Sequence, residues 1–432
     1  MMARFGKAGG RGVARREPRR WRWFQGRLSR GTGARTPVQG KEAAMRVIIV
    51  GSGIVGASCA YTASSRGAEV LLADAALPGQ ATAAGAGIVC PWSSSLADDP
   101  VWYDFASASA RYYPGLIAEL ANHGEVDLGY RRVGGLILAG SPEQQETVAQ
   151  QLLARRAGAP EIGDVAALSA AEARALFPPL RADCAAVRVA GACRVDGRLL
   201  ASSLVRAATS EGAALTSSRA ELVCRSGRAI GVMLKGQFVE ADAVVAATGA
   251  WTPSFLEPAG VTVAVTPQRG QIVHLSIEPD DTSNWPVVLP TTSSHYLLAF
   301  DGSRVVVGAT REPGTGFDYR VTPGGLAEVL GQALAVAPGL ATATYLETRV
   351  GFRPMSPDGR PLLGPVPGVE GLVVATGLGP NGLTMGPYVG AIAARVALGE
   401  PSGVDLGPVN PLRAAPSAAV PQPCPADAID LD

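Results

Sequence analysis

The sequence predicts an α/β protein in which a parallel α/β domain is combined with an antiparallel sheet. Strand-like and helix-like segments alternate near both ends of the chain, as they do in parallel βαβ units. A glycine-rich turn at residues 51–56 joins the first strand to the first helix. Residues 255–310 instead contain mainly strand patterns. They indicate an antiparallel sheet inserted into the first domain or lying beside it.

Hydrophobic periodicity predicts the individual elements. Helical spacing of apolar residues occurs at 54–66, 104–122, 143–156, 169–176, 198–210, 324–336 and 384–398. Short apolar runs predict strands at 46–50, 69–73, 133–139, 187–190, 214–223, 229–234, 242–247, 261–265, 271–276, 295–299, 304–308 and 372–375. The 432 residues, 47% of them hydrophobic, are enough for a large core and more than one domain.

Charge is distributed unevenly along the chain. Residues 1–44 contain twelve basic and two acidic residues, a net charge of +10, so the total of +1 leaves −9 for the remainder. A globular part with that balance does not suit nucleic acid as a partner. No run of about 18 apolar residues predicts a membrane-spanning helix.

Both ends of the chain are expected to lie outside the globular fold. Residues 1–44 form an Arg-rich extension without apolar periodicity, which predicts disorder. An export signal needs an apolar stretch that does not come before Val47, so we prefer a start of translation at Met45. An arm that binds nucleic acid or a membrane surface is the alternative. Residues 403–432 are predicted to be a disordered tail, rich in Pro and Ala from residue 412.

The cysteines and histidines give no metal signature. The six cysteines, at positions 59, 90, 184, 193, 224 and 424, form no CxxC pair. Free thiols of a cytoplasmic protein are therefore favoured over disulfides or a metal site. Three histidines leave little for a His-based site. We expect a cytoplasmic protein without a metal.

The first strand and helix meet in RVIIVGSGIVG, residues 46–56. Gly51 allows a tight turn, Gly53 lets the backbone approach a pyrophosphate, and Gly56 lets the helix pack against the strand. The helix N-terminus offers free N–H groups and a partial positive charge to phosphates. This pattern predicts a dinucleotide site.

The residues after this turn favour FAD over a nicotinamide cofactor. A second strand ends in Asp74, 21 residues beyond Gly53, where a carboxylate accepts hydrogen bonds from an adenosine ribose and disfavours a 2′-phosphate. An NAD-type unit usually continues with another strand and helix, whereas this chain continues with LPGQATAAGAGIV. Side chains that small allow the backbone to lie along an extended flavin dinucleotide.

Several separated motifs then carry a family resemblance. They are VIIVGSGIVG with Asp74, the small-residue stretch 82–87, VVAATGAWT (244–252), PQRGQIV (267–273), HYLLAFDGSRVVVGAT (295–310), and VGFRPMSPDGRPLLGPVPG with VVATGLGPNGLTMGP (350–387). Together they resemble the D-amino-acid oxidase and glycine oxidase superfamily of flavoproteins, including the D-amino-acid dehydrogenases. The resemblance spans roughly residues 45–402, and its last pair of motifs is the most specific.

The resemblance implies a fold and a cofactor. The fold is a glutathione-reductase-type FAD-binding Rossmann domain interleaved with an antiparallel-sheet substrate domain. The implied FAD-binding domain is discontinuous and comprises residues 45–95, 190–255 and 345–402. The implied substrate-binding domain comprises residues 96–189 and 256–344. FAD is expected to be non-covalent, because no Cys or His stands in a context that marks attachment.

The same resemblance implies the cofactor-binding positions. The ADP half of FAD is expected on Gly51, Gly53, Ile54, Val55, Gly56 and Asp74, with the adenine near Ala220. The pyrophosphate and flavin are expected beside Thr82, Ala83, Ala86, Gly87, Ile88, Thr248 and Gly249. The pyrimidine end of the flavin is expected at Gly379, Asn381, Gly382, Leu383 and Thr384. A helix that begins near Leu383 can stabilise negative charge on the reduced ring.

Two residues are the implied catalytic candidates. Arg353, in the sequence Gly-Phe-Arg-Pro, is implied to hold the substrate carboxylate, which a planar guanidinium matches in a bidentate way. Tyr296 is implied to place a hydroxyl near that carboxylate. Weaker candidates are Arg311, His295 and the pair Pro91-Trp92, although a core role is favoured for Trp92.

The implied reaction is oxidation of the Cα–N bond of a D-amino acid or glycine-like amine by hydride transfer to flavin N5. The imine then hydrolyses to a 2-oxo acid and ammonia. The chain departs from the family at Leu378, where many relatives have His, and at Pro380, near which glycine oxidases carry an arginine. Both positions lie beside the flavin ring, so they bear on the substrate.

Three alternatives stay open. They are a secondary-amine oxidase for sarcosine- or proline-like substrates, a flavin-binding subunit without turnover alone, and an NAD-dependent dehydrogenase. The electron acceptor is oxygen, a quinone or another compound. An oligomer is possible.

Overall fold

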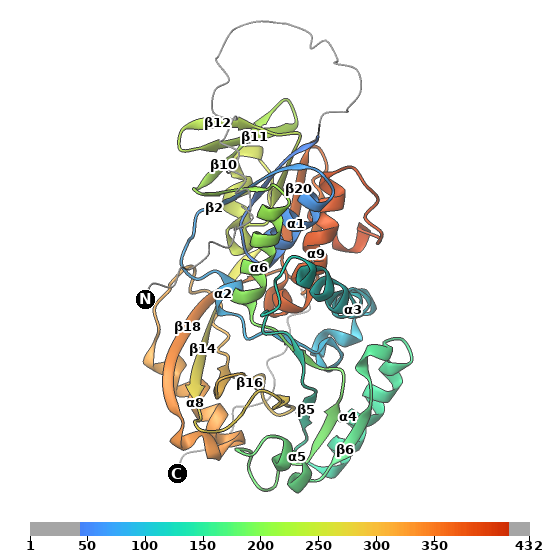
Figure 1. The fold of residues 1–432 in the computed structure, drawn as a ribbon, viewed down its shortest axis with the longest axis vertical. Coiled ribbons are helices and arrows are strands. Elements are labelled where there is room, and N and C mark those ends of the chain that lie inside the picture. Colours follow the sequence, from blue (N-terminus) through green and yellow to red (C-terminus); the bar gives the residue numbers. More distant parts are fainter. Residues whose placement is uncertain (1–43, 414–432) are drawn as a thin grey trace, which may run out of the picture. The chain divides into compact units, whose positions relative to one another are not determined.

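The computed structural model of the protein describes residues 44–413 (Figure 1). The predictions for residues 1–43 and 414–432 lie outside the described residues. Within the described range, no helix is long and apolar enough to cross a membrane.

A six-stranded sheet brings the two ends of the described chain together. Its strands, in spatial order, are β19 (Leu362–Pro365), β20 (Leu372–Thr376), β13 (Ala243–Ala246), β1 (Arg46–Val50), β2 (Glu69–Asp74) and β9 (Ala214–Ser217). Neighbouring strands are parallel except β19 and β20, which pair antiparallel. The predicted parallel α/β domain is confirmed.

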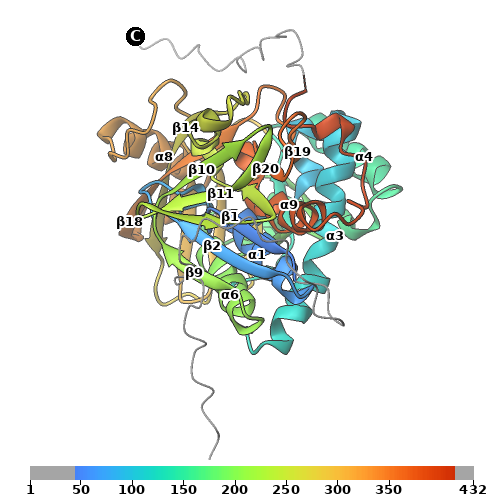
Figure 2. The ribbon, with the colours of Figure 1, turned by 90° about the horizontal axis from the view of Figure 1, so that it is seen from above.

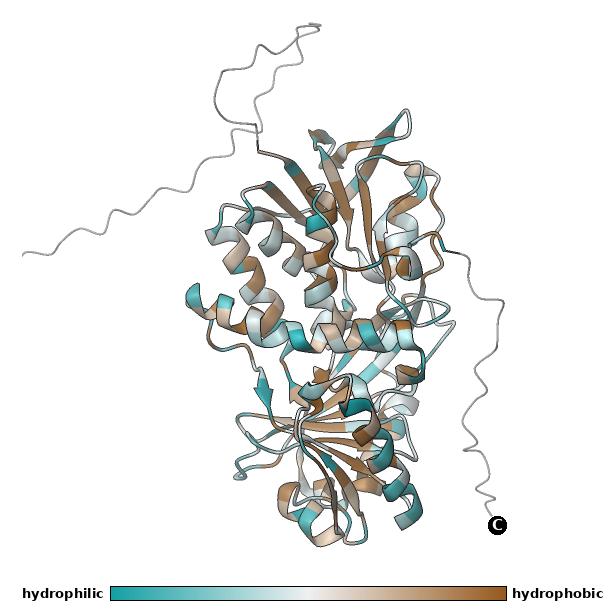
Figure 3. Ribbon diagram, turned by 90° about the vertical axis from the view of Figure 1, so that its right-hand side faces the viewer, coloured by the Kyte–Doolittle hydropathy of each residue, from teal (hydrophilic) through white to brown (hydrophobic). Residues whose placement is uncertain are grey.

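Both faces of this sheet are buried. Along β1, Val47 and Ile49 face one hydrophobic cluster, and Ile48 and Val50 face another. The first cluster includes helices α1 (Ile54–Ser65), α3 (Pro100–Asn122), α6 (Gly197–Ser210) and α9 (Gly382–Ala397). The second includes β10 (Ala220–Arg225), β11 (Arg228–Leu234), β12 (Gln237–Glu240) and α7 (Thr252–Leu256). Figure 2 shows β10 and β11 over β1 and β2. Burial on both faces explains the continuously apolar strands, which appear brown in Figure 3.

An eight-stranded, mainly antiparallel sheet forms the other large layer. Its strands, in order, are β18 (Thr344–Met355), β14 (Thr266–Ser276), β17 (Arg304–Gly308), β16 (Tyr296–Phe300), β15 (Val287–Pro290), β5 (Gly135–Leu138), β7 (Ala186–Val189) and β6 (Val165–Leu168). Only the pair of β15 and β5 is parallel among the described strands of this sheet. The remaining elements are α2 (Ala81–Ala84), α4 (Pro142–Arg156), α5 (Ala170–Leu176), α8 (Pro323–Val336), β3 (Ile88–Val89), β4 (Arg131–Arg132) and β8 (Cys193–Arg194).

Strand β18 is the main element that the sequence prediction lacks. Gly351 and Pro354 weaken its strand pattern, but it pairs with β14 along almost its whole length. This pairing corrects the domain boundary predicted at residue 345, because β18 belongs to the eight-stranded sheet. Helix α3, predicted within the substrate domain, instead packs against α9 and shares its core.

Two further predictions are corrected. Residues 261–265 form no strand, although Val263 and Val265 are buried in the cluster beneath the six-stranded sheet. Residues 403–413, predicted as part of a disordered tail, are ordered against the domain. Val409 is buried there, and Arg413 forms a salt bridge with Asp358, with 2.6 Å between Nη2 and Oδ1.

Candidate active site

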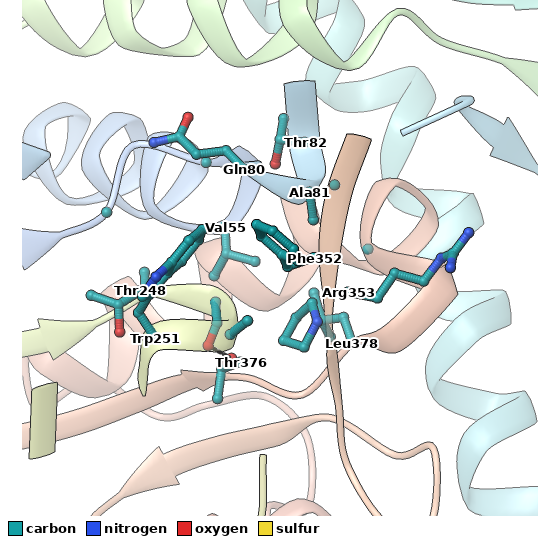
Figure 4. Close-up of a pocket in the computed structure, with 18 of the residues that line it drawn as sticks. Val55, Gln80, Ala81, Thr82, Thr248, Trp251, Phe352, Arg353, Thr376 and Leu378 are labelled. Carbon is teal, nitrogen blue, oxygen red and sulfur yellow. Dashed lines mark hydrogen bonds between the residues drawn. The ribbon is translucent and has the colours of Figure 1, made fainter. Parts of the chain in front are cut away.

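A cavity of about 490 Å³ extends from the end of β2 to the C-terminal part of β18 (Figure 4). Its walls come from the turn between β1 and α1, the segment around α2, the start of β10, the turn after β13, strands β14, β16 and β18 of the eight-stranded sheet, and the start of α9. Among the described residues that line it there is neither a cysteine nor a histidine.

The turn between β1 and α1 is closely packed backbone. Gly51 has φ +103°, and a Cβ on it would lie 2.4 Å from the carbonyl oxygen of Ala247. A Cβ on Gly56 would lie 1.8 Å from the carbonyl oxygen of Gly51. Helix α1 has no capping side chain at Gly53 and no acidic residue in its first turn. Its exposed N-terminal dipole therefore suits a phosphate.

Asp74, the last residue of β2, is a fixed carboxylate in the wall. It accepts hydrogen bonds from the backbone N–H of Ser52 at 2.5 Å, the Ser52 hydroxyl at 2.7 Å, the Ala76 N–H at 2.5 Å and the Gln80 amide at 2.9 Å. Ser52 and Gln80 are absent from the sequence prediction. These bonds orient the carboxylate toward a cavity in which a ribose hydroxyl would donate to it.

The small-residue stretch after β2 packs backbone against backbone. Gly87 has φ +95°, and a Cβ there would lie 1.7 Å from the Val195 carbonyl oxygen. A Cβ on Gly79 would lie 2.2 Å from the ring of Phe352. The hydroxyl of Thr82 accepts the N–H of Ile54 at 2.9 Å, which ties this stretch to the start of α1.

The opposite wall comes from the turn after β13 and the approach to α9. The Thr376 hydroxyl donates to the Gly249 carbonyl oxygen at 2.9 Å and so joins these two segments. A Cβ on Gly249 or Gly382 would meet no protein atom within 4 Å, although both residues line the cavity. Helix α9 begins at Gly382 without a capping side chain, which confirms the helix predicted to start near Leu383.

Arg353 lies at the other end of the cavity, on β18. Its guanidinium donates to the Thr310 carbonyl oxygen at 3.0 Å and to Gln268 Oε1 at 3.2 Å. Within residues 44–413, no carboxylate forms an ion pair with it. Burial lowers the pKa of the guanidinium, which nevertheless stays charged because its ordinary pKa is so high. An unpaired, fixed cation in a cavity suits an anionic ligand.

Tyr296, the first residue of β16, is the neighbour of Arg353. Its side chain lines the cavity, and its hydroxyl lies beside the guanidinium. Burial raises the pKa of Tyr296, and the positive charges of Arg353 and Arg311 offset part of that rise. The phenol is therefore a neutral hydrogen-bond donor at physiological pH.

Most of the predicted site residues meet in this cavity. Those that line it are Gly51, Gly53, Ile54, Val55, Asp74, Thr82, Ala86, Gly87, Ile88, Ala220, Thr248, Gly249, Tyr296, Arg353, Gly379, Gly382 and Leu383. Those that do not line it are Gly56, Ala83, Asn381 and Thr384. The Thr384 hydroxyl instead donates to the Ile88 carbonyl oxygen at 2.9 Å, which links α9 to the cavity wall.

Two aromatic side chains that the prediction lacks also form the wall. The rings of Trp251 and Phe352 lie 6.0 Å apart at 88°. Figure 4 shows Phe352 and Arg353 on opposite sides of β18, with Trp251 beside Phe352. The alternation of side chains along a strand predicts this separation once β18 is known. Trp251 belongs to the VVAATGAWT motif, so its presence in that motif is the sequence signal that could have placed it at the site.

The weaker candidates separate into two groups. Arg311 lines the cavity and is exposed. His295 does not line it; its Nε2 lies 3.2 Å from Glu328 Oε1. Trp92 is only 1% exposed and belongs to a hydrophobic core cluster, in agreement with the core role that the sequence favours for it. Leu378 and Pro380 both line the cavity, at the positions where the chain departs from the family pattern.

The residues present fit FAD. The N-termini of α1 and α9, whose N-cap residues give no capping side chain, both line one cavity, glycine backbone contributes to its wall, and Asp74 would accept hydrogen bonds from a ribose. Fold and site together define a flavin-dinucleotide oxidoreductase. The family model described as DAO, FAD dependent oxidoreductase, matches residues 46–396. The chain belongs to this family of FAD-dependent enzymes, which also removes the NAD-dependent alternative.

Similar proteins cover most of the chain. The chain is 47% identical over 365 residues to the uncharacterized oxidoreductase YurR of Bacillus subtilis (strain 168). This alignment covers 84% of this chain and 98% of that protein. A crystal structure of iminodiacetate oxidase from Chelativorans sp. BNC1 is 50% identical with a TM-score of 0.82, and covers 85% of this chain and 99% of that one. Glycine oxidase from Geobacillus kaustophilus is 29% identical with a TM-score of 0.74, over 86% and 100% of the two chains.

Proposed function

We propose that this protein oxidises the Cα–N bond of a small amino carboxylate, with FAD as the cofactor. The observation that carries the proposal is Arg353, a fixed guanidinium in the cofactor cavity with no carboxylate partner among the described residues. A carboxylate is the group whose shape and charge match that fork.

Arg353 and Tyr296 would hold the substrate by its carboxylate. Two strands position them, and fixed hydrogen bonds to Gln268 and Thr310 keep the guanidinium in place. FAD, when bound, supplies the acceptor for the hydride that leaves Cα. The protein contributes orientation, because holding Cα in one place replaces a bimolecular encounter.

The positive charge of the cavity also acts on the substrate nitrogen. The carboxylates among its described lining residues are Asp74, Glu221 and Glu257, none of which belongs to the strands that carry Arg353 and Tyr296. Nearby positive charge disfavours a protonated ammonium and so lowers its pKa. A neutral amine, the form with a lone pair to assist hydride loss, is favoured without a dedicated base.

The substrate class divides into primary and secondary amines. A D-amino acid or glycine is the first candidate, supported by glycine oxidases that are 30% and 28% identical to this chain. A secondary amine is the second candidate. It is favoured by the 50% identity to a protein named iminodiacetate oxidase, because iminodiacetate carries its carboxymethyl groups on a secondary nitrogen. We give preference to the secondary amine.

Anaerobic reduction of the purified holoenzyme tests the proposal. Iminodiacetate, sarcosine, glycine and D-alanine are added separately, and the loss of oxidised-flavin absorbance is followed. We expect reduction by at least one amino carboxylate, fastest with a secondary amine. Holoenzyme that stays oxidised with the whole panel, yet is reduced by dithionite, contradicts the proposal and favours a flavin-binding subunit. Readmission of oxygen or addition of a quinone then identifies the acceptor.

A further inference from the structure

The substrate end of the cavity contains a second arginine. Arg311 follows β17 and lines the same cavity as Arg353. The residue before it, Thr310, supplies the carbonyl oxygen that accepts a hydrogen bond from the Arg353 guanidinium. The two arginines are therefore held by one short segment, and the charge of each is felt by Tyr296.

Two carboxylates, Glu312 and Glu328, lie near Arg311, and among residues 44–413 neither forms a salt bridge with it. Glu312 accepts hydrogen bonds from Arg269 and Gln271 and from the Thr310 hydroxyl. Glu328 Oε1 lies 3.2 Å from Nε2 of His295, whose pKa is lowered by burial, and burial raises the pKa of Glu328 against the opposing charge of Arg311. Within residues 44–413, the one recorded hydrogen bond of the Arg311 guanidinium goes to the Ser294 carbonyl oxygen, at 3.2 Å.

Among the described residues, neither guanidinium forms a salt bridge with a carboxylate, and two such groups are more than a single substrate carboxylate requires. Like charges that share a cavity repel each other; burial is the main cause of the lowered pKa of Arg353, and the charge of Arg311 adds to it. A ligand with one negative charge would neutralise only one of them. A ligand with two negative charges would satisfy both and would remove the repulsion.

We propose that the substrate carries a second carboxylate and that Arg311 binds it while Arg353 binds the first. This inference rests on the proposed function and narrows it to amino dicarboxylates. Arg311 is a specificity residue at the rim, because its side chain is exposed whereas Arg353 is held inside. The exposed position limits its effect, since solvent screens an exposed ion pair. We expect about a ten-fold preference, the low end for a charge-assisted pair.

Binding of inert ligands tests the site without turnover. Oxydiacetate and ethoxyacetate have nearly the same length and differ in the second carboxylate. Each is titrated into oxidised holoenzyme, and the shift of the flavin spectrum gives its Kd. The expected ratio favours oxydiacetate about ten-fold, and Arg311→Gln removes the preference. If the ratio of the two Kd values is the same in wild type and in Arg311→Gln, the inference is overturned. It is also overturned if wild type binds both ligands equally well.

A matched control removes the effect of net charge. Arg188→Gln deletes an exposed arginine on β7, outside the cavity, and should keep the preference for oxydiacetate. Loss of the preference in this control overturns the assignment to Arg311. Arg311→Lys keeps a charge without the planar fork and is expected to restore part of the preference. If Arg311→Gln does not retain FAD, the binding measurements are made with Arg311→Lys in its place.

Turnover separates this inference from the proposed function. Iminodiacetate and N-ethylglycine are compared as a second matched pair, and the ratio of their kcat/KM values should fall about ten-fold in Arg311→Gln. Oxidation of both amines with an unchanged ratio overturns only the role of Arg311. Tight binding of oxydiacetate without oxidation of any amine supports the dicarboxylate site and contradicts the proposed reaction.

Discussion

The cavity end beside Asp74 and the end beside Arg353 are lined by different chemical groups. Near Asp74, the wall includes the backbone of Gly51, which is packed against the backbone of Ala247. Near Arg353, the wall consists of side chains from strands of one sheet, including Tyr296. Backbone in contact with backbone leaves no room for added atoms, whereas a side chain can be exchanged while the strand stays paired. We therefore expect all-or-none effects at the first end and graded effects at the second.

The largest effect is expected for Gly51→Ala. The new Cβ would lie 2.4 Å from the Ala247 carbonyl oxygen at a φ of +103°, so the segment has to move. We expect purified protein without FAD, as measured by the flavin-to-protein absorbance ratio. Gly115→Ala is the control, because nothing lies within 4 Å of its Cβ position in α3. Full flavin content in Gly51→Ala would break the contrast between the two ends.

A large but graded effect is expected for Arg353→Lys. Lysine keeps the charge and loses the planar fork, so a bidentate carboxylate contact becomes a single one. We expect kcat/KM for the best amino carboxylate to fall about 100-fold, equivalent to about 3 kcal/mol, with FAD content unchanged. Steady-state kinetics and the flavin spectrum measure the two quantities separately. An unchanged kcat/KM would remove Arg353 from the substrate site.

The two ends also differ in how far the sequence predicts them. The Asp74 end comes largely from contiguous residues, since Gly51, Gly53 and Asp74 belong to one βαβ unit. Glycine spacing and a strand-terminal acid are local signals, so the turn, the first helix and the role of Asp74 can be inferred directly. Its hydrogen-bond partners Ser52 and Gln80 lie beside the motif but carry no signature of their own.

The Arg353 end depends on pairing between distant segments. Strand β18 aligns Arg353 with Gln268 of β14, 85 positions earlier. No local pattern reveals that register, and Gly351 and Pro354 conceal the strand itself. Family resemblance implies Arg353 and Tyr296, with Arg311 only as a weaker candidate, and the sheet is what brings all three to one cavity. Sequence reasoning therefore predicted the cofactor more fully than the substrate.

Strand β14, which contributes to the substrate end, also carries a buried histidine outside the cavity lining. His274 of β14 is 3% exposed, and burial together with Arg349, Arg304 and Arg198 lowers its pKa to about 4, against an opposing effect of Glu347. The unfolded chain, with a His pKa of 6.5, binds more protons below that pH. The free energy of unfolding should therefore fall as the pH drops from 6.5 to about 4, by at most about 3 kcal/mol.

His274→Gln isolates this contribution from those of the carboxylates. Denaturant unfolding of wild type and variant is measured across that pH range, and the difference between the two curves is taken. We expect the variant to lose less stability on acidification than wild type. Parallel curves would show that His274 is not held neutral by its surroundings.

The smallest effect is expected for Tyr296→Phe, which removes one hydroxyl and keeps the ring that packs near Gly308. Burial raises the pKa of this phenol, so it acts as a neutral donor, and a neutral hydrogen bond contributes about 1 kcal/mol. We expect kcat/KM to fall by at most about ten-fold, with an unchanged pH profile and full FAD content. A loss near that of Arg353→Lys would mean that the hydroxyl acts in the chemical step itself. Retention of full activity would place it outside the substrate contact, leaving the arginines to define this end of the cavity.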